Sequence, residues 1–379
     1  MSDDILKADI LKETDRPTVS TRDPEEVRQR LERWLAHRLP AGAAPRVSEL
    51  AVPATNGMSS ETMLFDAHWH EDGCALTESF VARVAPDPDN VPVFPVYDLD
   101  RQFRVMQLVG EQTSVPVPRV RWSEPDLAAL GAPFFVMERV EGQVPPDVMP
   151  YNFGDSWLSD ATVVDQARLQ ESTIDVLAQL HAIEQPDRMF EFLGTGGLRQ
   201  CVADQWSYYQ WVAGGARSPL LEACFAWLDD HWPDDDGPAV LSWGDSRIGN
   251  VMYRNFEPVA VLDWEMAALG PREVDLAWLI FQHRFFEDLA AEHGFAGMPH
   301  FMRRDEVAAS YEALSGATPR HLDFYTMYAA LRHGIIMSRV ARRSIHFGEA
   351  AMPDDMDDLI MHRSTLEAML AGDYWDRLV

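Results

Sequence analysis

The chain is poor in cysteine and in long apolar stretches, and each shortage argues against a class of protein. Only three cysteines occur among 379 residues, and none are spaced as C-x-x-C, which argues against a disulfide scaffold or a cysteine zinc site. No run of about 18 apolar residues is present, so no membrane-spanning helix is expected. The acidic start is unlike a signal peptide, and we predict a cytoplasmic location.

Positive charge is also scarce. Lysine and arginine total 32 against 61 aspartate and glutamate residues, which gives a formal net charge of −29. A field of this sign repels nucleic-acid phosphates and anionic lipids, so neither is an expected partner. The composition is otherwise that of a globular chain, with 46% hydrophobic and 25% charged residues. Nothing in the sequence indicates an oligomeric state.

The apolar pattern changes along the chain from strand-like to helical. A helix is predicted after Asp23, because a capping residue is followed by Pro24 and, two residues later, by Glu26. Further apolar patterns predict a hairpin over 63–84, a helix over 99–109, and strands at 115–120 and 134–137. Beyond residue 142 the apolar spacing is mostly helical.

The predicted fold class is therefore α+β, with two lobes. A strand-rich N-lobe containing an antiparallel sheet precedes a larger, mainly helical C-lobe. The break lies at the Gly- and Pro-rich stretch Gly142–Asp147. We place an N-terminal extension with one helix at 1–44, the N-lobe at 45–141 and the C-lobe at 142–379.

The most informative stretch is Trp-Gly-Asp-Ser-Arg-Ile-Gly-Asn at 243–250. Asp245 and Asn250 have the D-x-x-x-x-N spacing that kinases use for a catalytic base and a metal ligand. This spacing arises often by chance, and Asp or Asn beside a turn is usually a capping residue. A second element is needed to support a phosphoryl-transfer site.

That element is a predicted hairpin formed by 251–253 and 259–262. If the hairpin is centred near position 256.5, Asn250 and Asp263 lie opposite each other, with Cβ atoms about 5 Å apart. An amide oxygen and a carboxylate at that separation can share one Mg²⁺ ion. The set of Asp245, Asn250 and Asp263 therefore favours a phosphoryl-transfer site over three unrelated capping residues.

With Val-Leu-Asp-Trp-Glu at 261–265 and Asp275-Leu-Ala-Trp278, these motifs resemble the aminoglycoside phosphotransferase (APH)/choline kinase superfamily, with actinobacterial phosphotransferases as the nearest counterparts. The likeness runs from about residue 45 to 370 and implies a protein-kinase-like fold. It makes Asp245 the catalytic base and Asn250 and Asp263 the Mg²⁺ ligands. It also makes Asp275 a structural carboxylate that ties the metal segment to the next helix. His181 matches a family position and is expected to be a packing residue.

In the N-lobe the resemblance implies ATP binding. Arg83 stands where kinases place a phosphate-binding lysine, and its strand parity puts it on the face opposite Phe80. The family usually has Glu at the position of Gln102, and Asp98, Asp100 and Glu78 are candidate substitutes. The nucleotide-binding residues implied are Gly57, Ser59 and Ser60 in a phosphate loop, Arg83, and the backbone of Glu138 and Val140 in the hinge.

The resulting prediction is an ATP- and Mg²⁺-dependent transferase that phosphorylates a hydroxyl group of a small molecule. The acidic surroundings suit a cationic acceptor, whereas aromatic residues such as Trp206 and Trp211 suit a hydrophobic alcohol or acyl group. A nucleotide-binding pseudokinase acting as scaffold or sensor is the alternative, favoured by Gln102. A metal-dependent hydrolase built on His68 and His70 is disfavoured, because no carboxylate partner is expected nearby.

Overall fold

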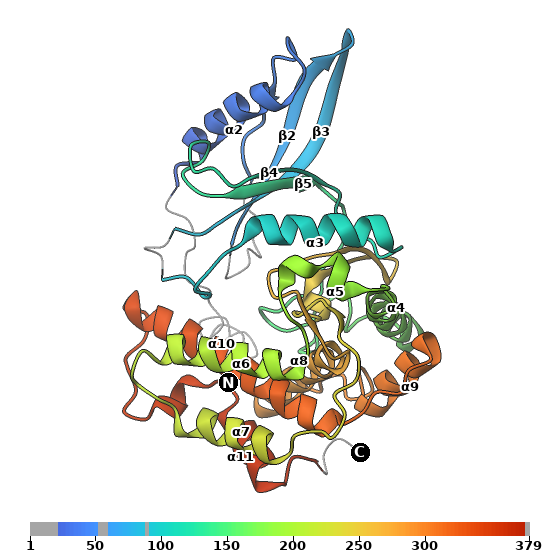
Figure 1. Cartoon of the computed structure of the whole chain (residues 1–379), viewed down its shortest axis with the longest axis vertical. Coiled ribbons are helices and arrows are strands. Elements are labelled where there is room, and N and C mark those ends of the chain that lie inside the picture. The colour runs from blue at the N-terminus through green and yellow to red at the C-terminus, as the bar shows by residue number, and fades with distance from the viewer. Residues whose placement is uncertain (1–21, 52–59, 88–90, 376–379) are drawn as a thin grey trace. The chain divides into compact units, whose positions relative to one another are not determined.

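The computed structural model describes residues 22–51, 60–87 and 91–375. They form two compact units (Figure 1). The sheet unit holds the described residues up to Gly110 together with Val117–Glu141. The helical unit holds Glu111–Pro116 and the described residues from Gly142 onward. The chain is mixed α+β, as the sequence predicted, with an antiparallel N-terminal sheet and a helical C-terminal part.

The sheet unit is built on five antiparallel strands in the order β1-β2-β3-β5-β4. Two helices belong to the same part of the chain. The elements are α2 (Pro24–Arg38), β1 (Arg46–Val47), β2 (Glu61–Glu71), β3 (Cys74–Val84), α3 (Leu99–Gln112), β4 (Val120–Glu124) and β5 (Phe134–Glu138).

Most of these elements were predicted. Asp23 caps α2 by accepting from the first-turn amides, and Trp34 of that helix packs 4.8 Å from the Phe134 ring, between centroids. The strand predicted at 115–120 is wrong in its bounds, because pairing begins only at Val120. Pro116 and Pro118 lack the N–H groups that a strand ladder uses.

The helical unit contains the remaining described helices, two pairs of short strands and three 3₁₀ turns. Its helices are α4 (Val163–His181), α5 (Pro186–Met189), α6 (Leu198–Ala213), α7 (Pro219–Asp230), α8 (Glu273–Glu292), α9 (Arg304–Ser315), α10 (Leu322–His346) and α11 (Arg363–Ala371). Its strands are β6 (Val240–Ser242), β7 (Val251–Arg254), β8 (Glu257–Val261) and β9 (Ala268–Gly270), and the 3₁₀ turns are η2 (Glu191–Leu193), η3 (Ile248–Asn250) and η4 (Met356–Leu359).

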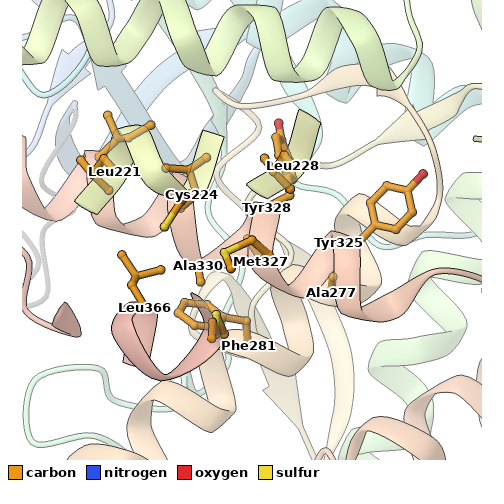
Figure 2. Close-up of a cluster of buried hydrophobic side chains, with 14 of the residues drawn as sticks. Leu221, Cys224, Leu228, Ala277, Phe281, Tyr325, Met327, Tyr328, Ala330 and Leu366 are labelled. Carbon is orange, nitrogen blue, oxygen red and sulfur yellow. The ribbon is translucent and has the colours of Figure 1, made fainter. Parts of the chain in front are cut away.

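The core of this unit lies where α7, α8, α10 and α11 meet. Figure 2 shows Leu221 and Cys224 of α7 facing Met327 of α10, with Phe281 of α8 and Leu366 of α11 beside them. All are buried, and burying such side chains stabilises the fold by about 1.5–3 kcal/mol each. None of the described helices has the length and apolar character needed to cross a lipid bilayer.

Two neutral histidines are buried beside this core. His362 donates from Nε2 to the Ala330 carbonyl at 2.9 Å, so its Nδ1 is left to accept from Nδ1 of His333, 3.3 Å away. The rings of Phe281 and Phe285 lie 5.4 and 5.7 Å from the His362 ring, between centroids. This burial lowers the pKa of His362 to about 4.

Acid should therefore weaken the fold as the pH falls from about 6.5 toward 4. The unfolded chain binds a proton at His362 below its ordinary pKa of 6.5, whereas the folded chain does so only near pH 4. The contribution of His362 to stability should thus fall by about 1.4 kcal/mol per pH unit between these values. His362→Gln keeps a donor and an acceptor without a titrating ring, and its urea stability should decline less steeply over this range. Equal slopes for the two proteins would contradict the expectation.

Candidate active site

Asp245 lies just after β6, and its carboxylate is held by three donors. Trp278 Nε1 donates to Oδ1 at 2.7 Å, while Asn250 Nδ2 and Arg247 Nε donate to Oδ2 at 2.7 and 3.2 Å. The side chain keeps 15% of its surface exposed. A carboxylate that is fixed in orientation and still reachable is suited to accept or orient a proton of a bound hydroxyl.

The backbone before Asp245 is anchored by the fully buried Asp275 of α8. Its carboxylate accepts from the backbone N–H groups of Trp243 and Gly244, both at 2.8 Å. It also accepts from Ser242 Oγ at 2.8 Å and lies 3.1 Å from Nε2 of His181. Burial alone would raise the pKa of Asp275, but the bonds to His181 and the backbone lower it below its ordinary value.

These contacts bear out the structural roles predicted for two residues. His181 is buried and also bonds the Tyr311 hydroxyl at 2.8 Å, as expected of a packing histidine. Asp275 is structural, but it holds the segment before Asp245 rather than the segment that carries Asp263. The loop that carries the candidate base is therefore anchored by Asp275, whose carboxylate has four hydrogen-bond partners.

Gly244 is required by the close approach of another segment. Its φ is +91°, and a Cβ atom built there would lie 2.1 Å from the carbonyl oxygen of Met266. No other residue type fits without a shift of the backbone. The loop that carries Asp245 and the segment that follows Asp263 therefore pack directly against each other.

The hairpin after Asn250 forms, but its predicted register is wrong by one residue. Val251 pairs with Val261, and the amide of Leu262 donates to the Asn250 carbonyl at 2.8 Å, so Asn250 faces Leu262 and not Asp263. The turn is a tight one in which Asn255 and its neighbour have positive φ, and the pairing shifts after Met252. A two-residue turn with an irregularity cannot be read from apolar alternation.

Asp263 follows this hairpin with a left-handed backbone, at φ +57°. Two buried indoles hold the chain just before it. Trp243 Nε1 donates to the Leu262 carbonyl at 2.9 Å, and Trp264 Nε1 donates to the Val261 carbonyl at 3.0 Å. Trp243 thus ties the Asp245 loop to the Asp263 segment.

Arg247 gathers acidic side chains around the candidate base. It forms ion pairs with Asp147 and Asp245. Although burial alone would lower the pKa of Arg247, the carboxylates of Asp147, Asp245 and Asp263 raise it above its ordinary value. Gly249 leaves room for this pair, since a Cβ there would lie 2.4 Å from an oxygen of Asp147.

The residues proposed to bind Mg²⁺ fit such an ion in their chemistry. The amide nitrogen of Asn250 donates to the Asp245 carboxylate, which leaves its amide oxygen for a cation. Mg²⁺ prefers oxygen ligands and commonly takes one or two carboxylates, with water and phosphate oxygens completing its shell. Across residues 22–51, 60–87 and 91–375, no three His, Cys, Asp or Glu side chains cluster as metal ligands.

The candidate phosphate-binding residues lie in the sheet unit. Arg83 on β3 faces Thr62 of β2, with Nη1 3.3 Å from Oγ1. Ser60 is fully buried and its hydroxyl has no hydrogen-bond partner among the described atoms. Gly57 and Ser59 lie outside the described residues. An unpartnered buried hydroxyl beside the predicted phosphate loop is compatible with a ligand contact.

The three acidic residues that could replace the glutamate expected at Gln102 all have other partners. Glu78 pairs with Arg121, Asp98 accepts from the amide of Arg101 in α3, and Asp100 accepts from Ser123. Each of the three is thus engaged with another residue of the sheet unit, and Gln102 itself is buried in α3.

The two predicted hinge residues end β5 and follow it. The amide of Glu138 donates to the Arg119 carbonyl at 2.9 Å, and its side chain pairs with Arg121 at 2.8 Å. Its N–H is therefore already used within the sheet unit. Val140 lies two residues beyond the strand and is half-buried. A contact of this segment with adenine stays a prediction.

A model of the phosphotransferase enzyme family, APH, matches residues 64–307, which is more than half of the chain. The chain belongs to this family. The match spans the Asp245 loop, the Asp263 segment and α8, and the antiparallel sheet with its helical C-terminal part agrees with the family's solved structures.

Solved structures of this fold are distant in sequence. A Ralstonia eutropha chain assigned to the aminoglycoside phosphotransferases is 19% identical with a TM-score of 0.63, covering 92% of this chain and 98% of that one. Aminoglycoside phosphotransferase APH(4)-Ia, solved with ADP and hygromycin B, is 16% identical with a TM-score of 0.52, covering 90% and 98%. At these identities the likeness establishes the fold alone.

The curated relatives of this APH family member are longer proteins. Human acyl-CoA dehydrogenase family member 11 is 27% identical over 53% of this chain, and the Arabidopsis thaliana protein IBR3, named as an acyl-CoA dehydrogenase, is 28% identical over 76%. The matches cover 25% and 35% of those two relatives, so this chain spans about a quarter to a third of their length.

Sequence reasoning missed two of the three side chains that donate to Asp245, those of Arg247 and Trp278. Arg247 and Trp278 were inside the quoted motifs but had no role assigned, and Asp147 was treated only as part of a lobe boundary. The spacing of Asp275 and Trp278 was a usable signal, because residues three apart on a helix lie on one face. One face of α8 therefore contacts the loop at two points: Asp275 binds its backbone and Trp278 binds the Asp245 carboxylate.

Replacing Asp275 should show how much the loop depends on it. Asp275→Asn puts an amide nitrogen against buried N–H donors, so we expect a loss of about 2–4 kcal/mol in the free energy of unfolding. Ser242→Ala removes only one of the four partners and should cost about 1 kcal/mol. Urea unfolding of both variants measures the difference, and similar small losses would mean that the buried carboxylate does not anchor the loop.

Proposed function

We propose that this APH family member transfers the γ-phosphoryl group of ATP to a hydroxyl group of a small molecule, with Mg²⁺ as cofactor. The observation that carries the proposal is the Asp245 carboxylate, which is fixed by Trp278, Asn250 and Arg247 yet remains partly exposed. Family membership supports a phosphotransferase. Bound ADP and AMP-PNP in two structural neighbours support a nucleotide as the donor.

In this mechanism Asp245 orients the acceptor hydroxyl and takes its proton. Both Asn250 and Arg247 donate to Oδ2, so Oδ1 is the oxygen with accepting capacity left beside its single bond from Trp278. The acceptor oxygen forms a bond to the γ-phosphorus, the bond from that phosphorus to the bridging oxygen breaks, and ADP leaves with the electron pair. The proton leaves Asp245 for solvent.

The rest of the site supplies charge and position. Asn250 and Asp263 would hold Mg²⁺, which neutralises charge on the ATP phosphates when bound. Arg83 and Ser60 are proposed to contact phosphate oxygens, together with Gly57 and Ser59. Holding the reactants in place and neutralising charge supplies most of the rate in this class of reaction.

The acceptor class is the part of the proposal with most alternatives. Hygromycin B is bound in one structural neighbour, and another is a macrolide phosphotransferase. The curated relatives carry acyl-CoA dehydrogenase names, which makes hydroxyacyl thioesters a further class to test. A screen that follows ADP release across aminoglycosides, macrolides, choline analogues, sugars and hydroxyacyl thioesters would identify it. Strong Mg²⁺-ATP binding without turnover of any acceptor or of water would favour the pseudokinase instead.

Removing the candidate base should separate chemistry from binding. Asp245→Ala should lower turnover by about 10²–10⁴-fold, the range over which a positioned acid–base group acts. Mg²⁺-ATP should still raise the melting temperature, because Asp245 is not a proposed nucleotide contact. Asp229→Ala, at an exposed carboxylate of α7, is the matched control and should behave as wild type. Retained turnover in Asp245→Ala would remove this residue from the mechanism.

Removing a proposed metal ligand should have a different signature. Asp263→Ala should lose the Mg²⁺-dependent part of the ATP-induced thermal shift, while the small shift produced by ATP with EDTA stays unchanged. A titration of Mg²⁺ at fixed ATP measures this, again with Asp229→Ala beside it. If millimolar Mg²⁺-ATP does not stabilise the wild-type protein at all, both the kinase and the pseudokinase proposals fail.

A further inference from the structure

Trp278 differs from the other two donors to the candidate base in the carboxylate oxygen that it contacts. Its indole Nε1 donates to Asp245 Oδ1 at 2.7 Å, and it is the only described residue that donates to that oxygen. The ring is 2% exposed, so the bond lies in a poorly hydrated environment. Because Oδ1 is the oxygen assigned to the acceptor hydroxyl, Trp278 fixes the position of the reacting atom.

A buried cation lies against the face of the same indole. The guanidinium carbon of Arg332, on α10, is 4.4 Å from the centroid of the Trp278 ring, and Arg332 is 4% exposed. Its Nη2 lies 3.3 Å from the sulfur of Met266, and its Nε has no hydrogen-bond partner. Within the described ranges no carboxylate forms an ion pair with Arg332.

Such a cation needs a compensating negative charge, since an isolated buried charge is strongly destabilising. The Asp245 carboxylate lies at the N–H edge of the same indole and accepts its hydrogen bond. A cation over an aromatic face attracts the π electrons toward itself, which leaves the N–H edge more positive. The indole then becomes a better donor to a carboxylate, a class of bond already stronger than one between neutral groups.

We propose that Arg332 and Trp278 form a positioning pair for Asp245. Arg332 polarises the indole, and the polarised N–H holds Oδ1 in the orientation that receives the acceptor hydroxyl. The pair acts on the carboxylate and not on the nucleotide. This inference rests on the proposed function, because it assigns Asp245 the role of the base.

The pair can be tested first without any acceptor. In protein labelled with ¹⁵N at its tryptophan indoles, the Trp278 N–H signal is the one lost in W278F. Its proton resonance should lie downfield among the indoles and should move upfield in D245A and in R332M. In R332K, which keeps the cation, the signal should stay near its wild-type position. An indole proton shift that is unchanged in both D245A and R332M would overturn the proposed pair, whether or not the protein has activity.

The second measurement is ADP release from Mg²⁺-ATP with water as the acceptor, after subtraction of the rate left in D245A. W278F keeps the aromatic ring over Arg332 and loses only the donor. We expect its kcat to fall about tenfold to a hundredfold, the loss that follows from a misplaced reacting group, with KM for ATP within about twofold of wild type. A parallel rise in KM, or a large fall in melting temperature, would indicate a general structural role.

The double variant separates this proposal from a direct contact between Arg332 and a ligand. If Arg332 acts through the indole, R332M should lower kcat in the wild-type background, R332K should restore most of it, and R332M should add little in the W278F background. An R332M effect of the same size in both backgrounds overturns the proposal. If D245A loses turnover while W278F and R332M keep wild-type rates, the positioning pair fails and the proposed function stands.

Discussion

The candidate site depends on one buried carboxylate, that of Asp275, which accepts the backbone N–H groups of Trp243 and Gly244. A buried charge is tolerated only when it is fully hydrogen-bonded, and here four partners meet that condition. The loop that carries Asp245 is thereby fixed to α8 at its backbone. Every other contact of Asp245 presupposes that the loop already has this shape.

From that anchor the site is built by short-range ties between segments. Trp243 donates to the Leu262 carbonyl and so fixes the backbone just before Asp263. The close packing of Gly244 against the Met266 carbonyl fixes the backbone just after it. Asp263 then adopts a left-handed backbone that few residue types tolerate. The arrangement concentrates negative charge around Arg247, whose guanidinium balances it.

The fold was largely readable from the sequence because apolar periodicity and capping are local properties. The cap at Asp23, the hairpin of β2 and β3 and the strand β5 all follow from residues within one element. The strand predicted from residue 115 was wrong in its bounds because Pro116 and Pro118 have no backbone N–H to donate to a strand ladder. The predicted register of the β7–β8 hairpin was wrong because the alternation of apolar and polar residues does not reveal the turn geometry, which has a positive φ at Asn255.

The sequence by itself determined the residue types of the site: a loop with Asp245 and Asn250 at a fixed spacing, and Asp263 after a strand. These separations along the chain are fixed by the sequence and do not depend on how the chain folds. Only the tertiary structure decided what surrounds them. Arg332 is separated from Trp278 by 54 positions along the chain, and the two meet because α8 and α10 pack in one core. Side-chain contacts between distant helices depend on packing, which no local pattern encodes.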